Sequence, residues 1–177
     1  EIQVAYLPPL IDGLRLTAAY GYNDSNYVKF VGPCAGGQKP SEGCNVPDGG
    51  LTLQNLNGSK KALAPENRLN LGINYNSILR SGLELGFNMN LKASDDYRLS
   101  DTIPDIKQPR YNTVDAGISL SSPNAGWKLA LIGRNLGDEY IQTSGSDAPS
   151  TGGGAGTEAG FAGDRYAYIK PGRTIAL

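Results

Sequence analysis

Hydrophobic and polar residues alternate strictly along six stretches of this chain. The longest run is Gly82–Ala93, where large apolar residues stand at every second position between polar residues or glycine. Shorter runs of the same kind cover residues 14–22, 69–75, 114–120, 127–133 and 175–177, and residues 1–6 add a seventh strand piece. Successive side chains of a strand point to opposite faces, so this alternation predicts β-strands with one apolar and one polar face. No residue on the apolar side of the six runs is charged.

The connections between these strands alternate in length. Short ones cover residues 7–12, 77–81 and 121–126, and long ones cover about 31–66, 97–109 and 137–165. In an up-and-down antiparallel sheet, alternate connections lie at opposite ends. All short turns are therefore expected at one end and all long loops at the other, which is the asymmetry of outer-membrane barrels.

A soluble β-sandwich also alternates apolar and polar residues, because one face of each sheet packs on a core. The barrel is favoured by the apolar row Leu83–Leu91, which at a tilt near 45° covers roughly 20 Å of height. Aromatic residues at strand ends match two interfacial girdles, with Tyr75 and Trp127 beside short turns and Tyr20 and Tyr22 beside a long loop. The sequence thus predicts an all-β fold, an antiparallel up-and-down transmembrane β-barrel segment with long extracellular loops and short periplasmic turns.

Composition narrows the possible chemistry. The 177 residues carry a net charge of -1 and no histidine, and the pI is about 5.4. A basic nucleic-acid surface is therefore not expected, and neither are His-ligated metals or Ser-His and Cys-His catalytic pairs. No run of 18 apolar residues exists that could form a membrane-spanning helix. We expect neither an enzyme nor a bound cofactor.

Three loop features invite a chemical interpretation. Cys34 and Cys44 lie in a Gly/Pro-rich stretch and predict a disulfide in an oxidising compartment, with two free thiols as the alternative. The glycine-rich segment 152–160 misses the dinucleotide fingerprint by one position and is expected to be a flexible loop. Four aspartates share one loop without the spacing of a calcium-binding loop, so a solvated loop is favoured over a metal site: Asp95, Asp96, Asp101 and Asp105.

Three segments together resemble a known family. Residues 127–140, with Asn135-Leu136 followed by acidic residues and Tyr140, resemble the penultimate strand of TonB-dependent outer-membrane receptors. Residues 171–177 are similar to the start of their last strand, although the terminal aromatic residue is missing. Residues 64–70 resemble the Ala-Pro and polar segment by which these barrels re-enter the membrane after a long loop.

The resemblance implies that residues 1–177 are the C-terminal portion of a single β-barrel domain, about the last seven of 22 strands. Such a receptor is closed by an N-terminal plug and lies in the outer membrane of a Gram-negative bacterium. It imports a scarce solute, such as a siderophore, cobalamin or a saccharide, with energy passed on by TonB. The implied partners are outer-membrane lipid and lipopolysaccharide, the plug and the remaining strands, TonB and a small-molecule ligand. The plug and the TonB-contacting segment are not in this sequence.

Two sets of residues are candidates for function. The polar face of the strands is expected to contact the plug or line a solute path: Arg15, Asn70, Asn74, Glu84, Asn88, Asn90, Lys92, Asp115, Lys128 and Arg134. Loop residues near the mouth are candidates for solute contact: Tyr27, Tyr97, Arg98, Tyr111 and Tyr140. The alternatives are a passive porin-like barrel, a secreted disulfide-containing β-rich binding module, and, least favoured, an outer-membrane enzyme.

Overall fold

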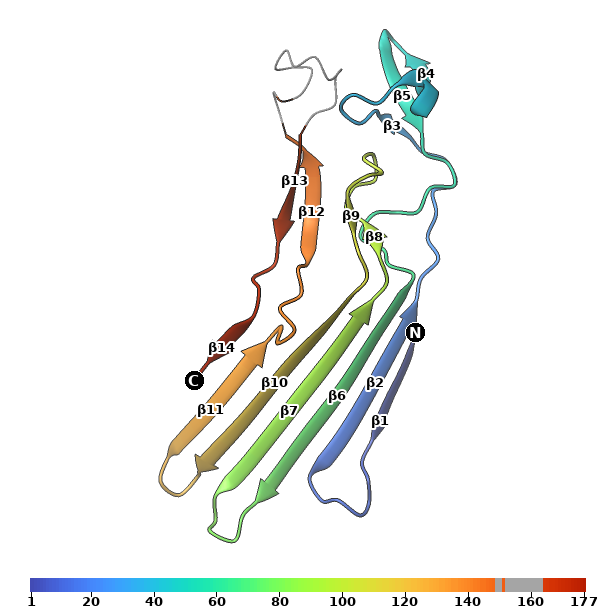
Figure 1. The fold of residues 1–177 in the computed structure, drawn as a ribbon. Coiled ribbons are helices and arrows are strands. Elements are labelled where there is room, and N and C mark those ends of the chain that lie inside the picture. The colour runs from blue at the N-terminus through green and yellow to red at the C-terminus, as the bar shows by residue number, and fades with distance from the viewer. Residues whose placement is uncertain (149–150, 152–163) are drawn as a thin grey trace.

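The computed structural model describes residues 1–148, 151 and 164–177. At its centre is one seven-stranded sheet in which every neighbouring pair is antiparallel (Figure 1). In spatial order the strands are β1 (Ile2–Tyr6), β2 (Leu14–Tyr22), β6 (Asn67–Ile78), β7 (Glu84–Ser94), β10 (Tyr111–Ser122), β11 (Trp127–Arg134) and β14 (Thr174–Ala176). They correspond to the six alternating stretches and the additional strand piece at residues 1–6, and the all-β, antiparallel, up-and-down arrangement is confirmed.

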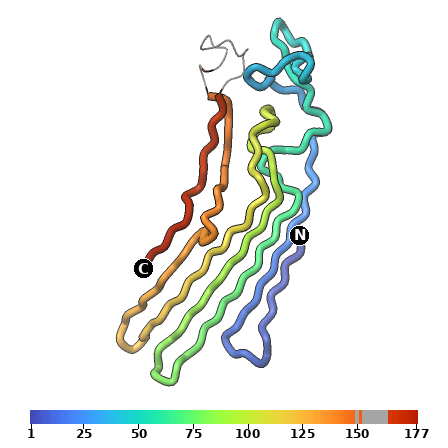
Figure 2. The backbone as a smooth tube through the Cα atoms, in the orientation of Figure 1, coloured from blue at the N-terminus to red at the C-terminus, as the bar shows by residue number. Residues whose placement is uncertain are grey.

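The sheet is an open wall with β1 at one edge and β14 at the other. The three short connections lie together at one end of this wall, the turn end, and the three long ones at the other, the loop end (Figure 2). Strand β7 begins two residues later than the alternation suggests. Gly82 has a φ of 79° and belongs to the tight turn, because its amide donates to the Leu79 carbonyl at 2.8 Å.

The long connections contain short strands that the sequence did not predict. Strands β3 (Val31–Pro33), β5 (Leu51–Asn55) and β4 (Cys44–Asp48) form a small sheet, in that order, beside the 3-10 helix η1 (Pro40–Glu42). Strand β8 (Tyr97–Arg98) pairs with β9 (Lys107–Gln108), and β12 (Gln142–Asp147) pairs with β13 (Arg165–Ile169). The glycine-rich segment 152–160 lies outside the described residues.

The buried apolar side chains lie outside the seven-stranded sheet. The one cluster of buried apolar side chains in the described residues lies at the loop end, formed by Ala35, Leu99, Ile103 and Ile106 with Tyr97 packed against it. Both faces of the seven-stranded sheet are largely open. The described residues include no helix with the length and apolarity needed to cross a membrane.

Candidate functional site

The two faces of the sheet differ in chemistry along its whole height. Across β6, β7 and β10, the pairs of the ladder place Leu71, Leu91 and Val114 on one face, with Met89 and Ala116 one step further along. Between them lie amides, hydroxyls and charges that point to the other face. We call these the apolar face and the polar face. Large residues of the apolar face remain exposed, such as Ile118 at 50% and Leu129 at 54%.

All ten residues predicted to share the polar face do share it. The ladder register assigns to that face Arg15, Asn70, Asn74, Glu84, Asn88, Asn90, Lys92, Asp115, Lys128 and Arg134. Their contact with a plug or a solute stays a prediction. The structure adds Arg68, which pairs with Gly21 and Ser94 on the same face and extends the predicted run by one step.

Polar side chains on this face bind one another across neighbouring strands. The Asn90 side-chain amide donates to the Asn70 side-chain oxygen at 2.7 Å, and the Lys92 ammonium lies 3.7 Å from the Asp115 carboxylate. Gly117 makes room for the Asn88 side chain, because a Cβ atom at position 117 would lie 2.9 Å from it. Several side chains of the polar face are therefore held in defined positions by a hydrogen bond and an ion pair with their neighbours.

Asn135 organises the turn that follows β11. It adopts a left-handed conformation with φ 48° and is buried. Its side-chain amide donates to the Glu139 carbonyl at 2.9 Å, and its side-chain oxygen accepts from the Glu139 amide at 3.0 Å. Its own amide donates to Asp115 at 2.8 Å. One residue of this turn also reaches the approach to β14, because Asp138 accepts from the Arg173 amide at 2.7 Å. The Asn-Leu-acidic-Tyr segment thus forms a hydrogen-bonded turn that positions β14.

The three long connections pack on one another. The described parts of residues 23–66, 95–110 and 135–173 together form a loop layer above the sheet (Figure 1). Two buried glutamines join its parts. The Gln54 amide donates to the Pro33 and Thr102 carbonyls, both at 2.7 Å, and so ties the first connection to the second. Gln108 accepts from the Gln142 amide at 2.6 Å and ties the second connection to the third.

A charged cluster joins all three connections. Asp147 accepts a hydrogen bond from the Gly36 amide at 2.8 Å and from the Arg165 guanidinium at 2.9 Å. The same guanidinium lies 3.5 Å from the Asp105 carboxylate. Two more of the four loop aspartates discussed above have partners, since Asp95 accepts from the Asn67 side chain and Asp101 from the Ala62 amide. Within the described residues, no group of three or more acidic, cysteine or histidine side chains is arranged to hold a metal ion.

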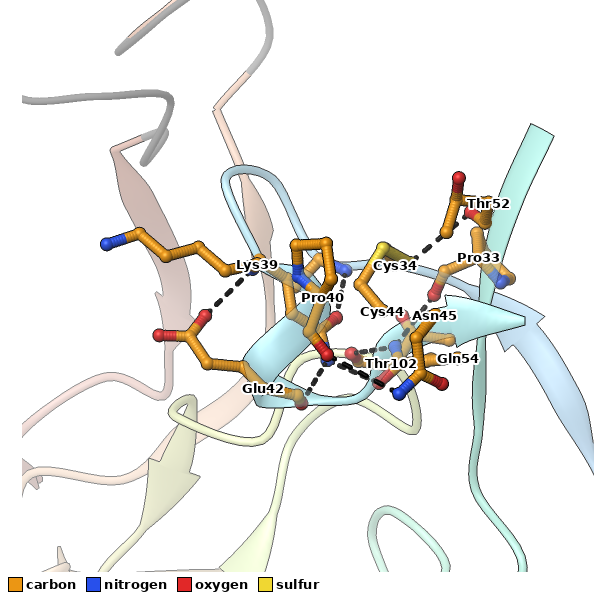
Figure 3. The surroundings of a disulfide bond; sticks show 12 residues. Pro33, Cys34, Lys39, Pro40, Glu42, Cys44, Asn45, Thr52, Gln54 and Thr102 are labelled. Carbon is orange, nitrogen blue, oxygen red and sulfur yellow. Dashed lines mark hydrogen bonds between the residues drawn. A yellow bond between two sulfur atoms is a disulfide. The ribbon is translucent and has the colours of Figure 1, made fainter. Parts of the chain in front are cut away.

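The disulfide lies in the outer part of this layer. Cys34 and Cys44 are joined, with their Cα atoms 5.6 Å apart, as the sequence predicts. Figure 3 shows Gln54 and Thr102 beside the bridge. The disulfide closes the segment that carries Ala35, which packs with side chains of the second connection, and Gly36, whose amide donates to Asp147 of the third. It therefore restrains the contacts between the connections.

The five candidates for solute contact do not lie at one place. The side chains of Tyr97 and Tyr111 interact with each other and line the same hollow on the polar face. Tyr27 instead packs against Phe30 with the two rings tilted by 36° and their centroids 4.6 Å apart. The Arg98 guanidinium donates to the Asp101 carbonyl at 3.1 Å. The Tyr140 side chain is 63% exposed.

The environment of Tyr97 favours a neutral phenol. Burial raises the pKa of Tyr97 above its ordinary 10.0, the neighbouring Tyr111 raises it further, and the Arg68 guanidinium lowers it. At neutral pH the Tyr97 hydroxyl is therefore a hydrogen-bond donor that lies beside the Arg68 guanidinium.

Two adjoining hollows occur on the polar face at the loop end. One has a volume of about 530 Å³ and the other about 340 Å³, and Lys92, Tyr111 and Lys170 line both. Arg68 and Tyr97 line the first, and Arg134, which like Lys92 was predicted for this face, lines the second. Sequence reasoning missed Arg68 and Lys170. The alternation could have indicated Arg68, whereas Lys170 lies outside every strand and reaches the hollows only through the fold.

Comparison with known proteins supports the fold. No protein-family model and no curated protein matches the chain. Among solved structures it is similar to the siderophore receptor PiuA from Acinetobacter baumannii, with 19% sequence identity and a TM-score of 0.61. The likeness covers 94% of this chain and 19% of that receptor, so the chain spans about a fifth of its length. The seven-stranded sheet and its loop layer therefore have the fold of a segment of a receptor barrel wall.

Proposed function

We propose that this chain is part of the barrel wall of a TonB-dependent receptor in the outer membrane of a Gram-negative bacterium. The observation that carries the proposal is the exposed apolar face of the sheet. Leu71, Phe87 and Leu131 are 37–46% exposed in the middle strands, and the described residues supply no second layer to cover them. Hydrocarbon is the solvent that such a face requires.

The dimensions of the sheet agree with a membrane. Strand β7 has 11 residues, and at about 3.3 Å per residue with a tilt near 45° it covers about 25 Å, the height of the apolar band of outer-membrane barrels. Tyr6, Tyr75 and Trp127 lie near the turn end, and Tyr20 and Tyr22 near the loop end. These positions suit the two aromatic girdles, with the loop end outside the cell.

The open edges require further strands. In lipid, unpaired backbone groups cost several kcal/mol each, so a spanning sheet has to close. The proposed partners are therefore the remaining strands of the barrel and a plug against the polar face. Outer-membrane lipid and lipopolysaccharide surround the apolar face, and TonB acts through a part of the receptor outside this sequence.

The transported solute is a scarce small molecule captured at the loop end. The structurally similar protein is a siderophore receptor, which makes a siderophore the first ligand to test, ahead of cobalamin and saccharides. The polar-face hollows and the loop layer are the proposed binding surface for this solute.

Uptake by whole cells tests this function. A strain that makes the complete protein should accumulate a radiolabelled siderophore, and deletion of TonB should abolish this accumulation. Accumulation that persists without TonB would show a passive porin-like barrel instead. Recovery of the complete protein from the periplasm or the medium, and not from outer membranes, would show a secreted binding module.

A further inference from the structure

The apolar face of the sheet contains a concave region on β7, β10, β11 and β14, which are neighbouring strands at one side of the wall (Figure 1). We call it the apolar hollow, and its volume is about 300 Å³. Its walls are large side chains: Phe87, Ile118, Leu131, Leu136 and Ile175. Every residue that lines it is apolar or glycine. Water would find no hydrogen-bonding side chain there, so the chemistry of the hollow fits hydrocarbon.

Two small residues form the floor of the apolar hollow. Ala116 of β10 pairs with Gly133 of β11, whereas the next pair on the same face joins two large residues, Ile118 and Leu131. Leu136 closes the hollow on the side of the loops, because its side chain lies over Gly133, where a Cβ atom would be 2.5 Å from it. The hollow therefore exists because one small pair interrupts the large residues of the apolar face.

The apolar hollow lies nearer the loop end of β11 than its turn end. Gly133 is the next-to-last residue of that strand. Leu136 belongs to the turn that follows, and its amide donates to the Val114 carbonyl at 2.8 Å, which fixes this wall. In the proposed orientation the loop end is outside the cell, so the hollow opens to the outer leaflet. The lipid of that leaflet is lipopolysaccharide, whose lipid A part carries acyl chains on a phosphorylated disaccharide.

A cation stands at the loop-end rim of the apolar hollow. Arg173 precedes the wall residue Ile175 by two positions, and β14 runs from the loop end toward the turn end. Arg173 is exposed. It does not line the hollow on the polar face, although Gly172 and Thr174 on either side of it do. The long side chain of Arg173 can therefore reach the membrane boundary above the apolar hollow.

The backbone of Arg173 is held in place while its charge is available. Asp138 accepts a hydrogen bond from the Arg173 amide at 2.7 Å. None of the ion pairs in the described part of the chain includes the Arg173 guanidinium. A guanidinium presents a planar set of N–H donors that matches the oxygen atoms of a phosphate. The rim is thus complementary to a phosphate, and the hollow is complementary to an acyl chain.

We propose that the apolar hollow and Arg173 bind one lipid A unit of lipopolysaccharide, with an acyl chain over Ala116 and Gly133 and a phosphate on the guanidinium. This inference rests on the proposed function, which places the apolar face in the outer membrane, and it adds a fixed lipid site to that face. A chain that moves from bulk lipid to protein gains no hydrophobic energy. Binding here depends on shape, because the walls contact the chain on several sides and so provide more dispersion contacts than a flat face does.

Native mass spectrometry of the complete protein, purified from outer membranes and freed of lipid in detergent, tests the site. The protein is titrated with purified lipid A and, separately, with phosphatidylethanolamine. Ala116→Leu fills the hollow, and Arg173→Gln removes the cation. Ala18→Leu is the control for the first variant, because Ala18 lies on the same face of β2, paired with Leu71, and outside the hollow. Arg80→Gln is the control for the second, because it removes the same charge from an exposed turn at the opposite end of the sheet.

We expect the first lipid A molecule to bind more tightly than later ones. Ala116→Leu and Arg173→Gln should each weaken this first binding about tenfold, the change expected when one charge-assisted hydrogen bond is lost. The two controls should bind lipid A as the unmodified protein does. Phosphatidylethanolamine should bind more weakly than lipid A, because its ammonium group offsets the charge of its phosphate. Heat-modifiable migration on gels verifies that each variant is folded.

A second measurement needs no substitution and therefore does not depend on the folding of any variant. A lipid A analogue with a photoreactive diazirine at the end of one acyl chain is added to the unmodified complete protein and illuminated. It should label peptides of β10, β11 and β14 in preference to peptides of β2 and β6, which form a part of the apolar face outside the hollow.

Several results would overturn the inference. Equal weakening by Ala116→Leu and Ala18→Leu, or equal labelling of all strands, would show unspecific lipid contact. Unchanged lipid A binding in Ala116→Leu and Arg173→Gln would remove the site, and tighter binding of phosphatidylethanolamine would assign it to a phospholipid. None of these outcomes affects TonB-dependent uptake. Recovery of the complete protein from the periplasm or the medium would instead refute the proposed function and the inference together.

Discussion

Strand β7 offers a direct test of which face meets lipid. Met89 lies midway between its two ends and pairs with Ile73 and Ala116 on the apolar face. Leu85 lies on the same face but beside the short turn, and Asn88 is adjacent to Met89 on the polar face. Placing arginine at each position compares one side chain at two depths and on two faces.

The expected costs follow from depth. Arginine at the middle of the hydrocarbon destabilises a barrel by about 2–4 kcal/mol, and near an interface by about 0–1 kcal/mol. Leu85 is four residues from Met89, which at about 3.3 Å per residue and a tilt near 45° brings it about 9 Å closer to the boundary. Met89→Arg should therefore cost about 2–4 kcal/mol and Leu85→Arg about 1 kcal/mol or less. Asn88→Arg should cost least, because its charge stays among the polar side chains of the polar face and out of hydrocarbon.

The assay is urea unfolding of the complete protein refolded in phospholipid vesicles, followed by its heat-modifiable migration on gels. The free energy of unfolding should fall in the order Asn88→Arg, Leu85→Arg, Met89→Arg, with the last variant least stable. An Asn88→Arg variant as unstable as Met89→Arg would refute the assignment of faces. Equal losses for Met89→Arg and Leu85→Arg would refute the membrane depth that we infer.

Three further predictions concern the loop end. Replacing both Cys34 and Cys44 by serine should remove about 2–3 kcal/mol of restraint on the loop layer, so proteolysis within residues 31–55 should accelerate while heat-modifiability stays unchanged; loss of the folded barrel would contradict this. Asn135→Gly should cost about 1–3 kcal/mol through the two lost bonds to Glu139, and Asn135→Ala about 1 kcal/mol more because of its positive φ; equal urea midpoints for the two variants would argue against backbone strain. The pKa of Tyr97 is raised above 10.0, so its neutral form stabilises the fold below that pH and the contribution is lost as pH rises through the higher folded value. Tyr97→Phe should therefore remove one phenolate absorbance change that occurs above pH 10.0 and shift alkaline loosening of the loop layer to higher pH, and an unchanged titration would refute the assignment.

The strands of the sheet could be predicted because their signal is local. Successive side chains of a strand point to opposite faces of the sheet, so side chains at alternate positions meet two different environments along its whole length. Leu91 and Lys92 are assigned to opposite faces by sequence alone, and the ladder register agrees. The ends were less certain. Gly82 continues the alternation but belongs to the turn, because its positive φ closes the chain reversal.

The loop layer could not be predicted in the same way. Strand β12 reads Gln-Thr-Ser-Gly-Ser-Asp and contains no large apolar residue. It pairs with β13, and Ile106 from another connection fills the space above Gly145, where a Cβ atom would lie 2.5 Å from the Ile106 side chain. Both partners are distant in sequence. No local pattern could therefore mark β12 as a strand.

The sequence by itself determined that this chain forms a two-faced antiparallel sheet, which residues belong to each face, and that Cys34 and Cys44 can pair. Tertiary structure alone decided where the functional candidates meet. It brings Tyr97 to Tyr111, places Arg68 and Lys170 around the same hollow, and leaves Tyr27 and Tyr140 outside it. The physical reason is that alternation reflects the environment of a single strand. A binding surface depends on contacts between segments that are far apart along the chain, and such contacts produce no periodic pattern in the sequence.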